Sequence, residues 1–257
     1  MKRAVFFLCL LISMMVIPSK AFTWGIATHA FFFHELGRRY GYYNLQEIYG
    51  AMLPDLFNVR YESPYRDYMW EQTHERFDKL VDKAYEGRLK AFVFGFVGHN
   101  AFWGADNIAN EGYVGEKIDS FRTETDFEDR LNEFLDGHGI NGELGTELAP
   151  LLAENFVETA IDFLVVQNEA PATALRIVLS AELRSYRIPF ALVRAYAWDL
   201  ARDHPGLSLF KAYRVIVDAE RGYRDLVRLY GGILMQDEST AFNLLVAQGV
   251  GLAEAFL

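Results

Sequence analysis

The sequence of 257 residues has one cysteine, Cys9, and it lies in an apolar run over residues 4–17. Two basic residues precede this run, and a small-residue site ending at Ala21 follows it. The run is too short for a transmembrane helix and has the layout of a secretory signal peptide, which we expect over residues 1–21. The mature protein is therefore expected to be secreted or periplasmic, with no transmembrane segment, no disulfide and no thiolate metal ligand.

Positive charge is also scarce. The chain holds 25 Lys and Arg against 35 Asp and Glu, a formal net charge of −10, and the signal peptide removes three basic residues and no acidic one, leaving −13. Binding of duplex nucleic acid depends on neutralising phosphates, so we expect no duplex partner. The excess of acidic over basic residues is not uniform along the chain, because residues 171–230 hold ten Lys and Arg against six Asp and Glu.

Strand signals are nearly absent, whereas helical periodicity recurs along the chain. Because 51% of the residues are hydrophobic, the chain can bury a sizeable core. We therefore expect an all-α, single-domain protein over residues 22–257. Helices are predicted over residues 27–39, 44–52, 63–86, 124–135 and 148–166, in a central helix from near Leu89, and as three or four amphipathic helices in the last eighty residues.

Two local signals refine this prediction. Asn44 stands where a helix N-cap is expected, with Glu47 three residues later completing a capping box. Pro54 then interrupts the chain and places Asp55 in a turn.

The central helix carries the sequence FVFGFVGHNAFWGAD over residues 92–106, an apolar run that includes a histidine and an aspartate. In a continuous helix His99, Trp103 and Asp106 share one face with the aromatic residues before them, so the polar pair is expected to point inward. A buried imidazole or carboxylate needs a partner, which for one isolated histidine is usually another side chain. Four more residues of metal-ligand type in apolar settings favour a metal instead: His29, Asp55, His74 and Glu158.

The order of these residues resembles the bacterial zinc-dependent phospholipase C family, which shares its all-helical fold with zinc-dependent single-strand nucleases. In that family an amino-terminal tryptophan, histidines, a Pro-Asp turn, a GxxxH-type helix followed by an aspartate and a histidine, and a final His-x-x-x-Glu surround three zinc ions. The resemblance covers about residues 22–162. It implies a phospholipase C-like core over residues 22–169 and leaves residues 170–257 as a C-terminal helical extension. Its motifs carry over onto Trp24, His29, Asp55, His74, His99, Asp106 and Glu158.

The central motif departs from the family. The family places its aspartate four residues after the central histidine, whereas Trp103 holds that position here and Asp106 comes three residues later. A seven-residue step adds about 10 Å of helical rise, so His99 and Asp106 can share a metal only if the helix is distorted near Gly104.

The remaining departures replace histidines. Asn110 stands near the position of the family's next histidine, and Glu154 stands in place of the histidine in the last motif. Glu154, Glu158 and Asp162 then form a row at four-residue spacing, which is either an exposed stripe or a set of carboxylates held together by water, arginines or metal. The resemblance implies zinc as the metal. With Glu154 and Glu158 as ligands the site is harder than that of the family, which makes manganese, magnesium and calcium alternatives. Cleavage after Ala21 would also prevent the amine of Trp24 from binding metal.

The resemblance implies a secreted, metal-dependent phosphodiesterase that hydrolyses a phospholipid or a small phosphodiester with up to three zinc ions. Asp55, the Pro-Asp residue, is the expected catalytic group. A single-strand nuclease-like hydrolase is an alternative with the same chemistry, and a catalytically degenerate relative that binds lipid or protein is an alternative of another class. Peripheral membrane contact agrees with a phospholipid substrate.

Overall fold

We describe a computed structural model, which defines residues 25–37, 41–57, 60, 63–84, 87–110, 129–130, 133, 136–137 and 157–254. These residues form helices and contain no strand, so the predicted all-α class is confirmed for them. None of the helices they form is long and apolar enough to cross a membrane. The predicted signal peptide, most of the predicted helix over 124–135, and the predicted ligands Trp24 and Glu154 lie outside the described residues.

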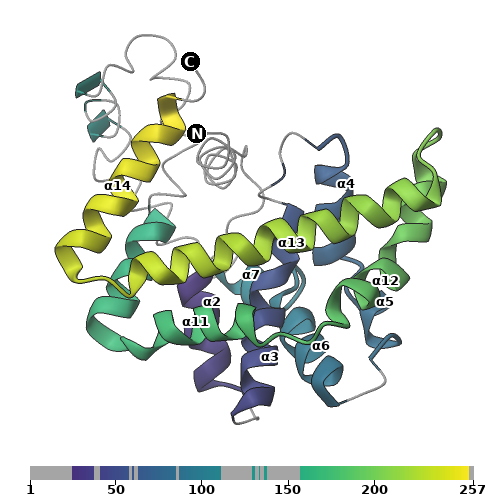
Figure 1. The fold of residues 1–257 in the computed structure, drawn as a ribbon, viewed down its shortest axis with the longest axis horizontal. Coiled ribbons are helices and arrows are strands. Elements are labelled where there is room, and N and C mark those ends of the chain that lie inside the picture. Colours follow the sequence, from purple (N-terminus) through teal and green to yellow (C-terminus); the bar gives the residue numbers. More distant parts are fainter. Residues whose placement is uncertain are drawn as a thin grey trace.

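The amino-terminal part is built on three helices that pack side by side, α2, α3 and α6, with shorter helices between them (Figure 1). The elements in this part are α2 (Ile26–Glu35), α3 (Tyr42–Met52), the 3-10 helix η1 (Leu53–Phe57), α4 (Arg66–His74), α5 (Asp78–Val81), α6 (Gly87–His99) and α7 (Ala105–Asn110).

The carboxyl-terminal part contains four helices, where the sequence predicts three or four. Residues 157–164 are helical and continue as the π-helical turn η2 (Val165–Glu169). The four helices are α11 (Ala172–Glu182), α12 (Ile188–Asp203), α13 (Leu209–Leu234) and α14 (Glu238–Glu254).

Helices α3 and α6 approach each other backbone to backbone. A Cβ atom on Gly95 would lie 1.9 Å from the carbonyl oxygen of Glu47, and one on Gly50 would lie 2.0 Å from the carbonyl oxygen of Phe92. Only glycine fits at these two positions, because no side chain can displace a helix backbone at low cost. The close crossing brings the end of α3, where Asp55 follows, next to the end of α6, which is His99.

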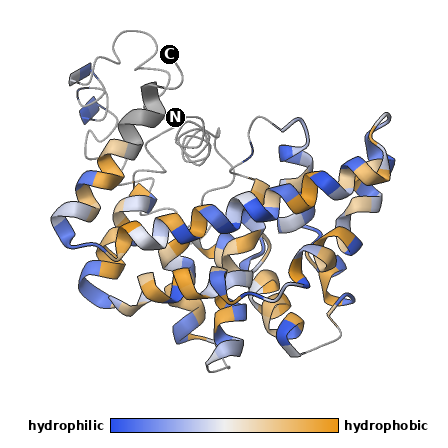
Figure 2. Cartoon of the chain, viewed as in Figure 1, coloured by the Kyte–Doolittle hydropathy of each residue, from blue (hydrophilic) through white to orange (hydrophobic). Residues whose placement is uncertain are grey.

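Helix α13 joins the two parts into one core. This long helix carries polar and apolar residues along its whole length (Figure 2). It packs against α11, α12 and η1 (Figure 1). Its buried Glu220 accepts hydrogen bonds from Tyr49 Oη at 2.8 Å and Arg184 Nη2 at 3.0 Å, and Tyr223 donates to the carbonyl of Met52. Apolar side chains of α2, α3, α6, α11, α12 and α13 pack in a single cluster.

One predicted helix end and one predicted helix start differ from the structure. Helix α2 ends at Glu35, four residues before the predicted end. Helix α3 begins at Tyr42 after Gly41, whose φ of 60° favours glycine, so Asn44 lies inside the helix and the predicted capping box is wrong. The Asn44 side chain instead donates to the carbonyl of Phe33 and contacts His34 Nδ1 at 3.0 Å.

The helix predicted over residues 63–86 is also wrong in part. It is two helices, α4 and α5, separated by three residues after His74. The central helix begins at Gly87, two residues before the predicted start, and ends at His99 rather than continuing to Asp106.

The α3–α6 crossing gives a direct test of this packing. Gly95→Ala should lower the free energy of unfolding by about 3 kcal/mol or more, because its methyl group collides with the backbone of α3. Gly232→Ala on α13 is the matched control, since a Cβ there meets no atom within 4 Å, and it should stabilise by up to about 1 kcal/mol through helix propensity. Chemical denaturation of both variants measures the difference; equal stabilities would contradict the crossing.

Candidate metal centre

Five of the predicted ligands converge on one place, and four of them stand at or next to a helix end. Asp55 lies in η1, His74 and His99 are the last residues of α4 and α6, and Asp106 is the second residue of α7. His29 comes from the middle of α2. Their ligand atoms form two groups, each within 4.8 Å: one of His29, Asp55 and His99, the other of His74, His99 and Asp106. The residues could therefore hold a metal ion.

The interruption after α6 makes this convergence possible. Asn100 Oδ1 accepts hydrogen bonds from the backbone N–H groups of Phe102 and Trp103, at 2.9 and 3.1 Å, and so stabilises a turn over residues 101–104. Helix α7 starts after this turn and brings Asp106 Oδ1 to 3.8 Å from His99 Nε2. The distortion expected near Gly104 is thus confirmed, whereas the inward position predicted for Trp103 is wrong, because its side chain is 60% exposed.

The orientation of two imidazoles is fixed by backbone carbonyls. His99 Nδ1 donates to the carbonyl of Ala51 at 2.7 Å, and His74 Nδ1 donates to the carbonyl of Trp70 at 3.0 Å. A carbonyl oxygen can only accept, so in the neutral rings both Nε2 atoms carry a lone pair rather than a hydrogen. Metal-binding histidines typically show this arrangement, in which the second nitrogen donates to a backbone or carboxylate oxygen.

These two lone pairs point at each other. His74 Nε2 and His99 Nε2 are 3.2 Å apart, and both rings are fully buried. Burial lowers the pKa of both imidazoles, that of His99 to about 4, so a proton shared between them is disfavoured near neutral pH. A metal cation, which needs deprotonated imidazole, would remove the repulsion without protonating either ring.

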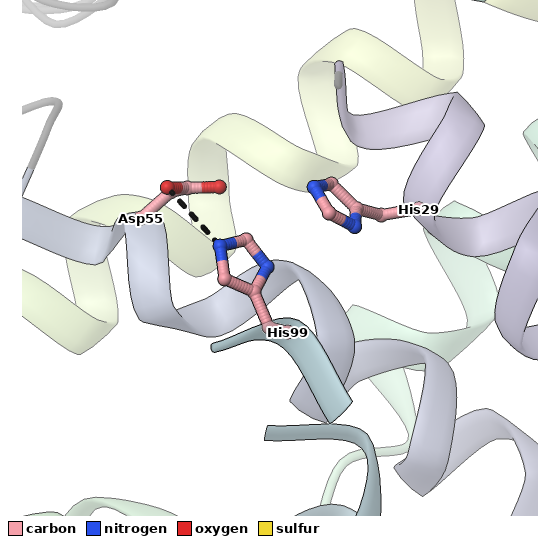
Figure 3. A group of neighbouring side chains, drawn as sticks. All are labelled: His29, Asp55 and His99. Atoms are coloured by element: carbon pink, nitrogen blue, oxygen red, sulfur yellow. Dashed lines mark ion pairs between the residues drawn. The ribbon is translucent and has the colours of Figure 1, made fainter. Parts of the chain in front are cut away.

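Asp55 stands beside both imidazoles. Its Oδ1 lies 3.3 Å from His74 Nε2. The same atom lies 3.7 Å from His99 Nε2, the ion pair drawn in Figure 3. The hydroxyl of Thr73 donates to the carbonyl of Pro54 at 2.9 Å and ties α4 to η1, which keeps Asp55 next to His74. Burial raises the pKa of Asp55 to about 7, although His99 opposes this rise. Asp55 is partly exposed, whereas the other four residues are buried, so it is the member of the cluster closest to solvent.

His29, on α2, completes the group that also contains Asp55 and His99. Its ring stacks on that of His99, with centroids 4.4 Å apart and planes inclined by 26° (Figure 3). Burial, followed by the neighbouring His99 and His74, lowers the pKa of His29 well below its usual value. The imidazole is therefore neutral at physiological pH and can act as a ligand.

The donor set fits a divalent cation. Three neutral imidazoles and two carboxylates carry a formal charge of −2, and nitrogen with carboxylate oxygen is a ligand combination found around zinc. His99 offers only Nε2, because its Nδ1 is bonded to the carbonyl of Ala51. One cation at His99 can accordingly draw its other ligands from His29 and Asp55, from His74 and Asp106, or from both groups.

One interpretation of the acidic row Glu154, Glu158 and Asp162 was an exposed stripe on a helix. Asp162 and Glu158 are both buried, so an exposed stripe is excluded for these two. The Asp162 carboxylate accepts hydrogen bonds from Ala27 N at 2.8 Å, Thr28 N at 2.7 Å, Thr28 Oγ1 at 2.7 Å and Tyr230 Oη at 2.9 Å.

These contacts make Asp162 the cap of α2. Gly25, the residue before α2, has no side chain to cap the helix, and a Cβ there would lie 2.3 Å from Asp162 Oδ2. A carboxylate at a helix N-terminus satisfies free N–H groups and is favoured by the helix dipole. Asp162 therefore fixes the start of the helix that carries His29, a function that no local sequence pattern indicated.

The other predicted ligands have no place in the two groups. Glu158 is buried near Tyr230, and its charge contributes, after burial and Asp162, to the raised pKa of that phenol. Glu158 belongs to neither of the two groups, and its part in metal binding stays a prediction, as do those of Trp24 and Glu154, which lie outside the described residues.

Comparisons with protein families, with curated proteins and with solved structures find no match for this chain. The fold and the site define a class only: over the residues that the structure describes, the chain is helical and contains a buried His/Asp group that could hold a metal ion.

Metal binding at this group should raise thermal stability. Removing metal with a chelator should lower the Tm of the wild type, and adding a divalent cation at about 100 times its Kd should stabilise the protein by about 2.7 kcal/mol. His99→Gln should lose this response, because it removes the imidazole common to both groups. His34→Gln, at a half-buried histidine bonded to Asn44, is the control and should respond like the wild type. An unchanged response of His99→Gln would contradict the site.

Asp162→Ala tests the cap on α2. It leaves two buried N–H groups and the Tyr230 hydroxyl without their acceptor and should cost about 3 kcal/mol or more of unfolding free energy. Asp67→Ala, at an exposed acid on α4, should stay within about 0.5 kcal/mol of the wild type. Denaturant titration compares the two, and a small effect at Asp162 would show that α2 does not depend on this carboxylate.

Proposed function

We propose that this protein is a metal-dependent phosphodiesterase that hydrolyses phospholipids or related phosphodiesters, as the resemblance to zinc-dependent phospholipase C implies. One observation carries the proposal: His74 Nε2 and His99 Nε2 lie 3.2 Å apart, each with its lone pair toward the other. The carboxylates of Asp55 and Asp106 lie beside these two nitrogen atoms. Such a cluster is costly to bury unless it binds a cation, and a buried metal-binding group near a solvent-accessible acid suits hydrolysis.

Zinc is the cation we propose. Three imidazoles favour zinc over magnesium and calcium, which prefer shells of oxygen ligands. The two carboxylates keep manganese as an alternative. His29, His74, His99 and Asp106 would hold the ion from the buried side, with Asp55 on the side nearer to solvent.

When bound, a divalent cation polarises a phosphoryl oxygen and lowers the pKa of a coordinated water. The chain's own contribution is to exclude bulk water from the four buried ligands and to place one carboxylate at the open side. We propose that Asp55 orients the attacking water and accepts its proton, since an acid partly exposed to solvent can pass that proton on.

The acidic chain favours a phospholipid over a nucleic acid substrate. The formal net charge of −10 repels a polyanion over the whole approach path, whereas a single phosphodiester group on a lipid experiences this field far less. A single-strand nuclease-like activity is therefore the weaker proposal of the two.

Turnover of a chromogenic phosphocholine diester tests the proposal. The metal-loaded wild type should hydrolyse it, lose activity with a chelator and regain it with zinc. Asp55→Asn should lower kcat by about a hundredfold or more while part of the metal stays bound, because the amide cannot accept the proton. Asp67→Asn, an exposed acid on α4, is the control and should retain wild-type activity.

The same experiment separates the alternatives. Metal bound without turnover of any phosphodiester would favour a degenerate relative that binds lipid or protein, since Asn110 and Glu154 replace two histidines of the family. If the purified protein binds no metal, the proposal of a metal-dependent phosphodiesterase is refuted.

A further inference from the structure

Trp70 stands beside the metal centre and is not one of its ligands. It lies on α4 one turn before His74, and the two rings stack with centroids 4.5 Å apart and planes inclined by 21°. The backbone carbonyl of Trp70 also accepts the hydrogen bond from His74 Nδ1, at 3.0 Å. Because both the ring and the carbonyl contact His74, the position of the indole is tied to that of a proposed metal ligand.

The indole N–H of Trp70 is a buried donor without an acceptor. Nε1 is shielded from solvent, and no hydrogen-bond partner lies within reach of it in the part of the chain that the structure describes. An indole nitrogen can only donate, and a buried donor that stays unpaired is costly. Buried polar groups in folded proteins normally have a partner, so we expect Nε1 to face either an internal water or a bound ligand.

The location of Trp70 favours a ligand over a water. Its side chain is half-buried, and so is that of Asp55, the member of the cluster closest to solvent. Both contact the same imidazole: the indole covers the face of His74, and Asp55 Oδ1 lies 3.3 Å from His74 Nε2. A molecule that reaches the proposed cation beside Asp55 therefore also comes close to the Trp70 ring.

The chemistry of this place selects an anionic oxygen as the acceptor. A cation held by the cluster attracts a negatively charged ligand, and a hydrogen bond to a charged group is roughly twice as strong as a neutral one. Indole donates without a positive charge of its own, so it does not compete with the metal for the carboxylates. A phosphoryl group has several non-bridging oxygens, so it can bind the cation with one and the indole with another.

We propose that Trp70 Nε1 donates a hydrogen bond to a non-bridging phosphoryl oxygen of the molecule that binds at the metal centre. The inference rests on the proposed function, which supplies the cation and the phosphoryl group. It adds a residue that binds the substrate directly, without ligating the metal or accepting a proton. Free phosphate and a phosphodiester share this oxygen, so both are compared in the test.

Trp70→Phe tests the donor, because phenylalanine keeps an aromatic ring beside His74 and the backbone carbonyl but has no N–H. Calorimetry measures zinc binding to the wild type and the variant, and then the binding of inorganic phosphate to each zinc-loaded protein. Zinc affinity should be unchanged. The affinity for phosphate should fall at least about tenfold, since one hydrogen bond to a charged group is lost.

Two further variants control for the loss of indole volume. Trp198→Phe makes the same substitution on α12, at an indole that is 68% exposed, and should bind zinc and phosphate like the wild type. Replacement of Trp70 by benzothienylalanine keeps the shape of the indole and lacks the N–H, so it should lose phosphate affinity as Trp70→Phe does. This variant decides the test if circular-dichroism melting shows that Trp70→Phe is poorly folded.

A second titration with dimethyl phosphate identifies the source of the oxygen. Loss of affinity for both ligands in Trp70→Phe assigns the donor to the phosphoryl group of a diester substrate. Loss for inorganic phosphate alone assigns it to free phosphate bound at the same place.

Two results would overturn the proposal and leave the proposed function standing. Equal phosphate affinities of the zinc-loaded wild type and Trp70→Phe would assign Nε1 to an internal water. A loss of zinc affinity in Trp70→Phe as large as its loss of phosphate affinity would limit Trp70 to orienting His74. A wild type that binds no zinc is distinguishable from both, because it would refute the proposed function and this inference together.

Discussion

The opposition of two imidazole nitrogens is the interaction on which the structure of this region depends. His74 and His99 come from different helices, and each is oriented by a hydrogen bond from Nδ1 to a backbone carbonyl, so that their Nε2 atoms meet at 3.2 Å. Neutral rings repel at this distance and protonated rings are disfavoured by burial. A cation could satisfy both nitrogens, and Asp55 and Asp106 lie close enough to supply compensating charge.

The fold serves this cluster by placing helix ends together. The glycine-mediated crossing of α3 and α6 brings η1 to the end of α6, and the turn after Asn100 redirects the chain so that α7 can return Asp106. From the other side, Asp162 and Tyr230 hold the first turn of α2 and, through it, His29. The carboxyl-terminal helices thus support the site, and they share one apolar cluster with the amino-terminal helices.

The sequence predicted much of this arrangement where its signals are local. Helical periodicity gave the all-α class, and isolated polar residues in apolar runs gave five residues that the structure brings together. The continuous helix through Trp103 was wrong because a side-chain bond of Asn100 to the next turn outweighs apolar periodicity. The cap of α2 could not be predicted, because Asp162 lies 134 residues from Thr28 and no spacing rule connects them.

X-ray absorption at the zinc edge, measured on the purified mature protein loaded with zinc, tests the central claim most directly. A cation between His74 and His99 predicts imidazole nitrogen ligands at about 2.0–2.1 Å together with carboxylate oxygen, and loss of part of the imidazole signal in His74→Gln. A protein that retains no zinc, or a shell of oxygen ligands alone that His74→Gln leaves unchanged, would contradict the account.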